Sequence, residues 1–241
     1  MTSCLSGRVA VVTGAGSGIG AAIAIDLAAR GARVAIVARH EPPLRSVAET
    51  IEQAGGTAHV VVSDVADPKS VVAAAESTRV NLGRPQILVN GAGFADTCLV
   101  EELTMNEVDH MIDVNLKGVI YWTKAVLPDL LVDGGDIVNI ASLGGVRSFP
   151  GWSLYCAAKH GVVGFAGALA QEVADRNVRV TTICPGATAT ALWEKPGMSY
   201  SGPAEVMLEP RQVAATVLHI LEIPRHVLFK DVLMLPAGEW A

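Results

Sequence analysis

The sequence has few cysteines and no excess of basic residues. Its four cysteines are far apart and include no Cys-x-x-Cys pair: Cys4, Cys98, Cys156 and Cys184. Cysteines scattered in this way are typical of reduced thiols and argue against a disulfide framework or a zinc site. The net charge is −6, so the chain offers no overall electrostatic attraction to nucleic acid or to an anionic membrane. We therefore expect no metal ion and no nucleic-acid partner.

The sequence also lacks a long apolar segment. Its longest stretch without a charged residue, between Arg8 and Asp26, has 17 residues and contains four glycines. A transmembrane helix needs about 20 predominantly apolar residues. The N-terminus has neither the basic stretch nor the apolar segment of a signal peptide. We therefore expect a cytoplasmic protein without a membrane partner.

Short apolar runs alternate regularly with longer amphipathic stretches along the chain. The short runs are rich in Val and Ile and show no polar alternation, which is typical of strands covered by helices on both faces. They span Arg8–Thr13, Val34–Ala38, His59–Ser63, Gln86–Asn90, Asp136–Ala141, Arg179–Cys184 and Asp231–Leu235.

Helical signals lie between these runs. After the first run, Ile19, Ile23 and Leu27 repeat every four residues, and Gly31 follows as a stop signal. Alternating strands and helices predict right-handed crossovers between parallel strands. We therefore expect an α/β fold: a Rossmann-like doubly wound parallel sheet of about seven strands, with helices on both faces and one domain over residues 1–241.

One stretch fits neither pattern. Residues 191–209 contain Pro196, Gly197, Gly202 and Pro203, which interrupt any regular periodicity. A loop of this length in a compact domain is usually functional. We expect it to act as a lid over a substrate pocket.

The first predicted strand runs directly into a glycine-rich turn, TGAGSGIG at residues 13–20, and then into a helix. Glycines permit a tight turn and let the backbone approach a pyrophosphate closely. The N-terminus of the following helix presents free N–H groups and the positive end of its dipole to phosphates. The spacing is TGxxxGxG, since Ile19 occupies the place of the third glycine in GxGxxG. The turn therefore predicts a dinucleotide site.

Further motifs follow in order, each at a predicted strand end or on a predicted helix. They are Asp64-Val65, Asn90-Gly91-Ala92-Gly93, Asn115, Ser142, Tyr155 with Lys159, and Pro185-Gly186 with Thr190. In order and spacing these motifs resemble those of the short-chain dehydrogenase/reductase family, and the resemblance covers nearly the whole chain. It implies an oxidoreductase that moves a hydride between a nicotinamide cofactor and a carbonyl or alcohol.

The resemblance also implies roles for individual residues. The implied catalytic tetrad is Asn115, Ser142, Tyr155 and Lys159. Lys159 would also bind the nicotinamide ribose, and Asn115 would place a water that links Lys159 to solvent. The residues expected to bind the cofactor are Gly14, Gly16, Ser17, Gly18, Ile19, Gly20, Arg39, His40, Asp64, Val65, Asn90, Ala92, Gly93, Tyr155, Lys159, Pro185, Gly186, Thr188 and Thr190.

Tyr155 and Lys159 are four residues apart, so on a helix they project from one face. The pKa of a free tyrosine is about 10, too high for an effective proton exchanger at neutral pH. A nearby ammonium group favours the phenolate, so we expect Lys159 to lower the pKa of Tyr155. Tyr155 would then serve as general acid in carbonyl reduction or as general base in alcohol oxidation. The hydroxyl of Ser142 would hold the substrate oxygen.

The end of the second predicted strand indicates which nicotinamide is used. Where NAD-dependent family members carry Asp or Glu, this chain has Ala38, which removes the repulsion of a 2′-phosphate. Arg39 follows, and it can pair with that phosphate and stack on the adenine. Alternatively, Arg39 is a surface residue for which Glu41 competes, and Ser17 is not the basic residue that some NADP-dependent members carry in the turn. We expect NADP(H).

The sequence constrains the substrate less. Large apolar side chains flank the motifs and either line a pocket or pack in the core: Phe94, Leu143, Phe149, Trp152, Leu192 and Trp193. Of these, Phe94, Phe149 and Trp193 are expected to bind the substrate together with Ser142. A carrier-protein substrate would favour a basic docking surface, whereas the chain has Asp129, Asp133 and Asp136 in that region. We expect a small-molecule carbonyl or alcohol.

Small residues recur on the predicted helix after Tyr155, at Gly161, Gly164 and Gly167. Such a helix either packs on its own sheet or approaches the backbone of another subunit. The family resemblance favours pairing of this helix and of residues Glu107–Leu130 with a second copy. We therefore expect a homodimer or a homotetramer.

Two other functions are compatible with the same fold. One is a regulator that binds NADP(H) without catalysis, although a sensor has no need of the Ser142, Tyr155 and Lys159 set. The other is an epimerase or dehydratase that uses the cofactor without net oxidation.

Overall fold

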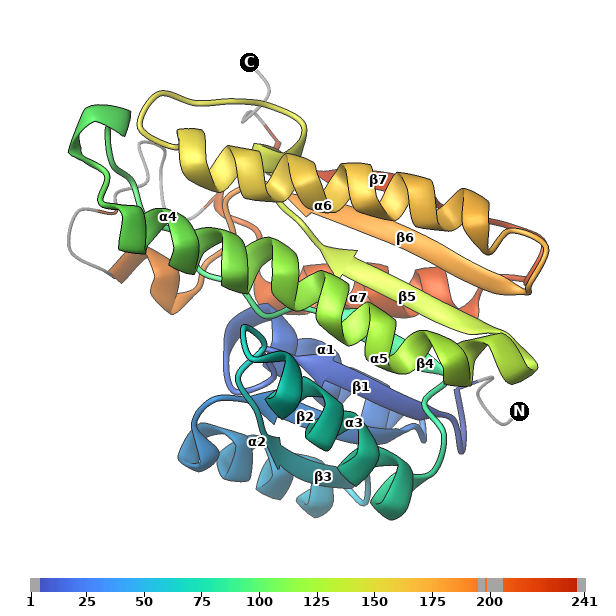
Figure 1. The fold of residues 1–241 in the computed structure, drawn as a ribbon. Helices are drawn as coiled ribbons and strands as arrows, with labels where there is room; N and C mark the ends of the chain where they lie inside the picture. Colours follow the sequence, from blue (N-terminus) through green and yellow to red (C-terminus); the bar gives the residue numbers. More distant parts are fainter. Residues whose placement is uncertain (1–4, 195–197, 199–205, 238–241) are drawn as a thin grey trace.

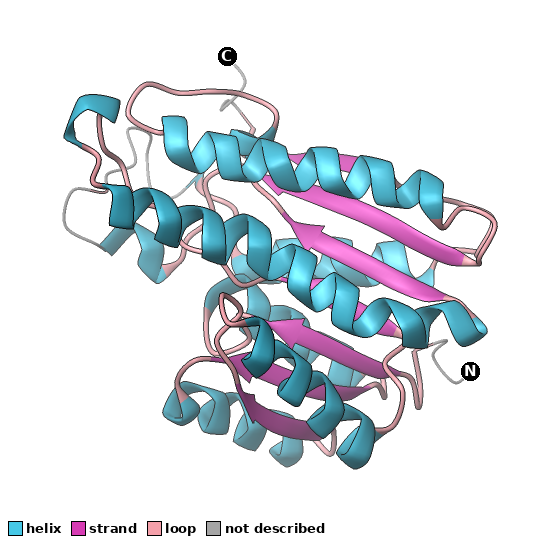
Figure 2. Ribbon diagram, in the orientation of Figure 1, coloured by secondary structure: helices cyan, strands magenta, loops and turns pink. Residues whose placement is uncertain are grey.

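A parallel β-sheet organises the chain (Figures 1 and 2). The structure, a computed structural model, describes residues 5–194, 198 and 206–237. Seven strands are joined in the order β3-β2-β1-β4-β5-β6-β7, and every neighbouring pair is parallel. The strands are β1 Val9–Thr13, β2 Arg33–Ala38, β3 Thr57–Val62, β4 Ile87–Asn90, β5 Gly135–Ile140, β6 Val178–Pro185 and β7 Asp231–Met234. The predicted α/β fold and all seven predicted strands are confirmed, with ends shifted by at most two residues.

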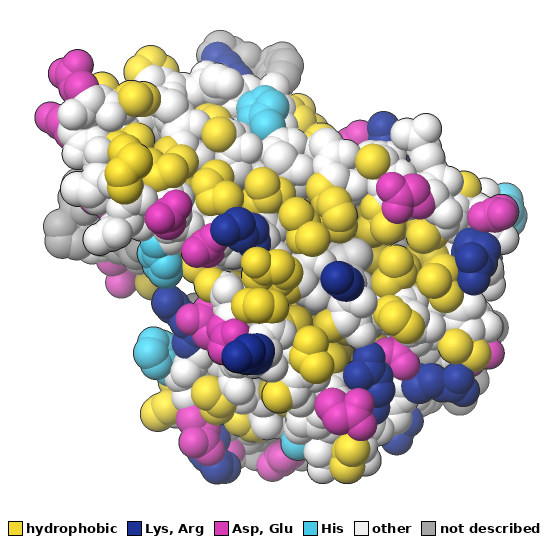
Figure 3. Space-filling view, viewed as in Figure 1, with side chains coloured by type: hydrophobic (Ala, Val, Ile, Leu, Met, Phe, Trp, Pro, Cys, Tyr) yellow, Lys and Arg dark blue, Asp and Glu magenta, His cyan; other side chains and the backbone are white. Residues whose placement is uncertain are grey.

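Helices cover both faces of the sheet (Figure 1). The helices on one face are α1 Gly18–Ala29, α2 Glu41–Gln53 and α7 Pro210–Glu222. Those on the other face are α3 Pro68–Leu82, α5 Gly118–Asp133 and α6 Ser153–Glu172. The short helix α4 Met105–Ile112 leads through a π-helical turn, Asp113–Lys117, into α5. Figure 3 shows hydrophobic side chains among scattered charged ones on the face that α5 and α6 cover. Within the described ranges, no helix is both long and apolar enough to cross a membrane.

The strands are buried on both sides, which explains their continuous apolar runs. In β1, Val9 and Val11 belong to the core beneath α3, α5 and α6, whereas Ala10 and Val12 belong to the core beneath α1, α2 and α7. Successive side chains of a strand point to opposite faces. A strand between two helical layers therefore needs an apolar residue at every position.

The order of the strands creates a crevice at one edge of the sheet. β1 lies between β2 and β4, so the chain runs outward from β1 to β3 and then crosses back to β4. Beside such a switch of direction, the loops after the two central strands diverge, and ligands bind at the C-terminal ends of those strands. The glycine-rich turn after β1 and the residues after β4 meet at this point.

At the opposite edge of the sheet, three arginines surround one buried carboxylate. Asp136 is 2% exposed. Its oxygens accept hydrogen bonds from Arg8 at 2.7 Å, Arg179 at 2.7 Å and Arg225 at 2.8 Å. Arg179 also donates to the carbonyl of Leu221 at 3.3 Å. The cluster thereby ties the sheet to the end of α7, and Asp136 does not belong to an acidic surface. Asp136 therefore cannot count among the acidic residues that distinguish this region from a basic docking surface.

We predict that Asp136→Asn lowers the free energy of unfolding by about 3 kcal/mol, because Arg179 would keep a buried charge without its counter-charge. Urea denaturation monitored by circular dichroism measures the change. The matched control is Asp133→Asn, whose exposed pair with Arg84 spans 3.9 Å and contributes at most about 1 kcal/mol. Equal, small effects of both substitutions would contradict the prediction.

Candidate active site

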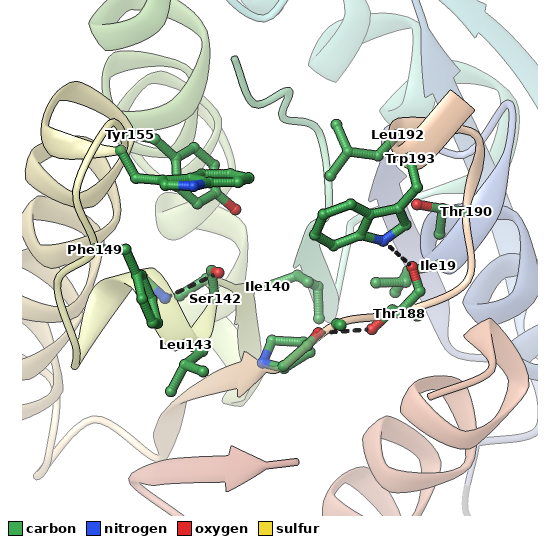
Figure 4. A pocket seen from close by; sticks show the side chains of 16 residues that line it. Ile19, Ile140, Ser142, Leu143, Phe149, Tyr155, Thr188, Thr190, Leu192 and Trp193 are labelled. Atoms are coloured by element: carbon green, nitrogen blue, oxygen red, sulfur yellow. Dashed lines mark hydrogen bonds between the residues drawn. The ribbon is translucent and has the colours of Figure 1, made fainter. Parts of the chain in front are cut away.

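Two adjoining cavities open at the C-terminal ends of the strands. The first, here called the apolar cavity, has a volume of about 290 Å³, and Figure 4 shows its lining side chains. The second, here called the glycine-rich cavity, has a volume of about 460 Å³ and contains the turn after β1. Ligand pockets typically measure about 300 to 1,000 Å³. The two cavities share the lining residues Ile19, Ile140, Thr190 and Leu192, so a molecule in one reaches the other.

The glycine-rich turn is held against the loop after β4 by direct backbone contact. A Cβ atom on Gly14 would lie 2.7 Å from the carbonyl oxygen of Gly91, and one on Gly20 would collide with the carbonyl of Gly14. Gly14 also has a φ of +70°, which disfavours a side chain. Below them, the hydroxyl of Thr13 accepts hydrogen bonds from the N–H groups of Gly91 and Ala92, both at 3.1 Å. These contacts leave bare backbone and the start of α1 at the cavity wall.

Most of the residues predicted to bind the cofactor come together around the glycine-rich cavity. Its lining includes Gly14, Gly16, Ser17, Gly18, Ile19, Gly20, Arg39, His40, Asp64, Val65, Ala92, Gly93 and Thr190. Tyr155, Pro185, Gly186 and Thr188 line the apolar cavity instead. Asn90 lines neither cavity: it is 2% exposed, and its Nδ2 donates to Asn139 Oδ1 at 2.9 Å.

Arg39 is exposed at the rim of the glycine-rich cavity, next to Ala38. The sequence left open whether Glu41 pairs with Arg39. Instead, the carboxylate of Glu41 pairs with Arg45, one turn further along α2. In the part of the chain that the structure describes, the Arg39 side chain has no hydrogen bond or ion pair. Its guanidinium therefore remains available to an anion in this cavity.

Ser142 and Tyr155 meet at the wall of the apolar cavity. Ser142 follows β5 directly, and its hydroxyl accepts a hydrogen bond from the N–H of Gly144 at 3.0 Å. Tyr155 lies in the first turn of α6, close enough to the hydroxyl of Ser142 for that hydroxyl to lower the pKa of the phenol. The absence of a side chain at Gly144 permits this approach, since a Cβ there would lie 3.1 Å from the tyrosine ring. A strand end and a helix start thus bring together two hydroxyls that are thirteen residues apart in sequence.

Lys159 and Asn115 lie behind Gly93. Lys159 is 5% exposed and its Nζ donates to the carbonyl of Ile140 at 3.1 Å. Asn115 is fully buried in the π-helical turn, where its Oδ1 accepts from the N–H of Phe94 at 3.2 Å and its Nδ2 donates to the carbonyl of Met111 at 3.2 Å. The structure therefore brings all four residues of the predicted tetrad to one place. Hydrogen bonds to the backbone of Phe94 and Met111 hold the Asn115 side chain in place.

Burial is the main cause of the shifted pKa values of Tyr155 and Lys159. It raises the pKa of Tyr155 to about 12, and the nearby hydroxyl of Ser142 offsets only part of this rise. Burial also lowers the pKa of Lys159 to about 8. The expectation that Lys159 lowers the pKa of Tyr155 below its ordinary value is therefore wrong, because loss of hydration outweighs the attraction of an ammonium group 5.7 Å from the ring centre. At neutral pH the phenol keeps its proton and most of the lysine is charged.

The residues predicted to contact the substrate divide between the two cavities. Ser142, Phe149 and Trp193 line the apolar cavity. Phe94 lines the glycine-rich cavity and stacks on His110 with ring centres 4.7 Å apart. Much of the predicted lid at residues 191–209, namely 195–197 and 199–205, lies outside the described residues.

Comparison with known proteins agrees with this geometry. A sequence model of the short chain dehydrogenase family matches residues 8–199. The chain belongs to this family. It is 35% identical to an uncharacterized oxidoreductase of Staphylococcus aureus, over 96% of this chain and 98% of that protein. It is also 38% identical to the glycine betaine reductase of Emericella nidulans, over 98% of this chain but only 19% of that much longer protein.

Solved structures of the family share the fold. An alcohol dehydrogenase from Thermococcus sibiricus, complexed with 5-hydroxy-NADP, has a TM-score of 0.86 and 30% identity, covering 94% of this chain and 95% of that one. A metagenomic short-chain oxidoreductase in complex with NADP has a TM-score of 0.85 and 33% identity, covering 96% and 98%. This short-chain dehydrogenase is an oxidoreductase that acts on CH–OH or C=O groups.

The sequence did not single out several residues that line the dehydrogenase's cavities. Pro43, Ser63, Val114 and Ile140 line the glycine-rich cavity. Ile140 ends β5 and Ser63 directly follows β3. Both therefore lie at C-terminal strand ends, where the sequence pattern could have predicted a place beside the ligand. Pro43 and Val114 lie on helices, and only the packing of those helices brings them to the site. Of the cysteines, Cys98, Cys156 and Cys184 are free, as expected, and Cys4 lies outside the described residues.

We predict that Gly93→Ala lowers kcat/KM by about tenfold to a hundredfold, the usual cost of misplacing reacting groups by about 1 Å. The new Cβ would lie 2.7 Å from Asn115 Oδ1, so this side chain must shift, and it would also touch Lys159 Nζ at 3.4 Å. The control is Gly167→Ala on α6, where the added methyl group meets nothing closer than Lys230 at 3.9 Å. Steady-state kinetics of both variants test the prediction, and an unimpaired Gly93→Ala enzyme would refute it.

Proposed function

We propose that this dehydrogenase interconverts a small-molecule carbonyl and its alcohol with NADP(H), using Tyr155 as the proton donor and acceptor. One observation carries the proposal. The side chains of Ser142 and Tyr155 line the apolar cavity together, and this cavity shares Ile140 and three further lining residues with the glycine-rich cavity. A carbonyl oxygen held by both hydroxyls would place its carbon toward the shared boundary of the two cavities.

The glycine-rich cavity fits a dinucleotide. Side chains at Gly14 or Gly20 would collide with neighbouring backbone, and their absence leaves N–H groups free to meet a pyrophosphate at the start of α1. The adenosine half would lie near Ala38, Arg39 and Asp64, while Lys159 would hold the ribose beside the nicotinamide. When bound, a reduced nicotinamide supplies a hydride to the carbonyl carbon.

Ser142 and Tyr155 would orient the substrate and transfer the proton. The Ser142 hydroxyl donates a hydrogen bond to the substrate oxygen and orients the carbonyl. Tyr155 delivers its proton to that oxygen as negative charge develops there. Because the pKa of Tyr155 is raised to about 12 by burial, the phenol is fully protonated at neutral pH, which suits the reductive direction. Alcohol oxidation requires the phenolate and would be favoured by alkaline pH.

Two observations support NADP(H) over NAD(H). Ala38 removes the carboxylate that would bind a 2′-hydroxyl and repel a 2′-phosphate, and the exposed Arg39 has no protein partner among the described residues. The two similar solved structures were determined with NADP or a derivative of it. We therefore propose that the guanidinium of Arg39 binds the 2′-phosphate of NADP(H).

A small-molecule substrate agrees with the size of the apolar cavity, about 290 Å³. Glycine betaine, after which the Emericella nidulans relative is named, is likewise small. The predicted homodimer or homotetramer stays a prediction, and α6 offers a surface for it. Ala157, Gly164 and Ala168 are exposed along one side of α6, and a side chain at Gly164 would meet nothing within 4 Å.

We predict that Tyr155→Phe lowers NADPH-dependent reduction by at least about a hundredfold, the usual contribution of a general acid. Purified protein is assayed for NADPH consumption with a panel of aldehydes, ketones and quinones, and products are identified by mass spectrometry. Tyr121→Phe on α5 is the matched control and should keep the parent rate. NADPH binding without any turnover would favour a regulator, and product formation without net NADPH consumption would favour an epimerase or dehydratase. Either result would overturn the proposal.

We also predict that Arg39→Ala reduces the preference for NADPH over NADH by about tenfold to a hundredfold, since a charge-assisted hydrogen bond contributes about 1.5 to 3 kcal/mol. The ratio of kcat/KM for the two cofactors measures this preference. Arg33→Ala, at the other end of β2, removes the same charge far from the cavity and should leave the ratio unchanged. If both variants behave alike, Arg39 does not bind the 2′-phosphate.

A further inference from the structure

We infer that the apolar cavity selects carbonyl substrates that carry a quaternary ammonium group, held by Trp152 and Trp193. This inference rests on the proposed function, because it names the substrate class of the same site. It follows from the concentration of aromatic rings in the cavity, from the angles between them, and from the absence of charge in the lining.

Aromatic residues make up only 5% of the chain, yet four of them line this one cavity: Phe149, Trp152, Tyr155 and Trp193. Figure 4 shows Phe149, Tyr155 and Ser142 on one side of the cavity and Trp193 with Leu192 on the other. These four residues therefore border one cavity from separate segments of the chain.

The angles between the rings favour a rounded group over a flat one. The ring centres of Trp152 and Trp193 are 6.4 Å apart with their planes inclined by 54°, and those of Trp152 and Tyr155 are 5.6 Å apart at 68°. Parallel rings form a slot for a planar substrate, whereas steeply inclined rings form a corner. A trimethylammonium group is nearly spherical and can contact both walls of such a corner.

The two tryptophans provide the strongest cation-binding faces. Indole attracts a cation more strongly than phenol or benzene does. Within the protein, the guanidinium of Arg147 already lies over Phe149 at 5.6 Å and the ammonium of Lys159 lies over Tyr155 at 5.7 Å. Trp193 is held in place by a hydrogen bond from its Nε1 to the carbonyl of Thr188 at 2.9 Å, so little ordering is needed when a ligand binds.

The lining disfavours an anionic substrate. Among the described residues, no charged side chain lines the apolar cavity, so a carboxylate or phosphate would lose its hydration without gaining an ion pair. A quaternary ammonium ion has no N–H group to satisfy and is compensated by ring faces alone. Because Tyr155 belongs to both the ring cluster and the catalytic pair, the cation and the reacting carbonyl must be close together in the substrate, separated by only one or two carbon atoms.

A matched pair of aldehydes tests the charge separately from the shape. Trimethylammonioacetaldehyde and 3,3-dimethylbutanal differ in having nitrogen or carbon at the branched centre, so they have nearly the same shape and only the first is charged. With NADPH and the unmodified enzyme, we expect kcat/KM for the cation to exceed that for the neutral aldehyde by at least about tenfold, which corresponds to about 1.4 kcal/mol.

Substitutions at Trp193 test whether its aromatic ring causes the preference for the cationic aldehyde. Trp193→Leu removes the aromatic face, and we expect the ratio of the two kcat/KM values to fall toward one. Trp193→Phe keeps an aromatic face and should keep most of the ratio. Binding of choline and of 3,3-dimethylbutan-1-ol in the presence of NADP⁺, measured by calorimetry, provides the same comparison without turnover.

Equal efficiency with both aldehydes, or a ratio that Trp193→Leu leaves intact, overturns the inference. In that case, reduction of the neutral aldehyde still supports the proposed oxidoreductase function. Failure to bind choline together with failure to reduce the cationic aldehyde also overturns it, and the general carbonyl panel then decides separately whether the proposed function stands.

Discussion

The close contact between the backbone turns after β1 and β4 is the constraint on which the site depends. Gly14 and Gly20 approach each other and Gly91 so closely that no side chain fits, and the hydroxyl of Thr13 ties the two turns together through the N–H groups of Gly91 and Ala92. The contact lies where the strand order changes direction, between β1 and β4. It leaves the start of α1 open toward the cavity, which lets a pyrophosphate reach bare N–H groups.

Around this contact, burial decides the chemistry of the polar groups. Tyr155 and Lys159 both lose hydration, so the phenol holds its proton more tightly and the ammonium holds its proton less tightly than in water. This arrangement agrees with the proposed role of Tyr155 as a proton donor in the reductive direction. A charged nicotinamide beside Tyr155 would favour its phenolate, so the two directions of the reaction would differ in how strongly the proton is held. At the far edge of the sheet, burial acts on Asp136 in a different way, because three arginines compensate its charge.

Much of the fold and of the site was predictable because both follow from local patterns. The continuous apolar runs predicted seven buried parallel strands, and residues that follow those strands, such as Gly14, Asp64, Ala92 and Ser142, had to meet at one edge of the sheet. Predictions failed where three-dimensional surroundings overrule the local pattern. Asp136 has the sequence context of a surface acid but is buried among three arginines.

By itself, the sequence determined the order of strands and helices, the position of the glycine-rich turn, and which side chains could exchange a proton or pair with a phosphate. These properties depend on periodicity, on the conformations open to glycine, and on the chemistry of single residues. Only the tertiary structure decided that Arg39 is free of Glu41, that the pKa of Tyr155 is raised, and that Trp152 and Trp193 meet at a steep angle. Each of these depends on distances between segments far apart along the chain and on the water that their packing excludes, which no local pattern encodes.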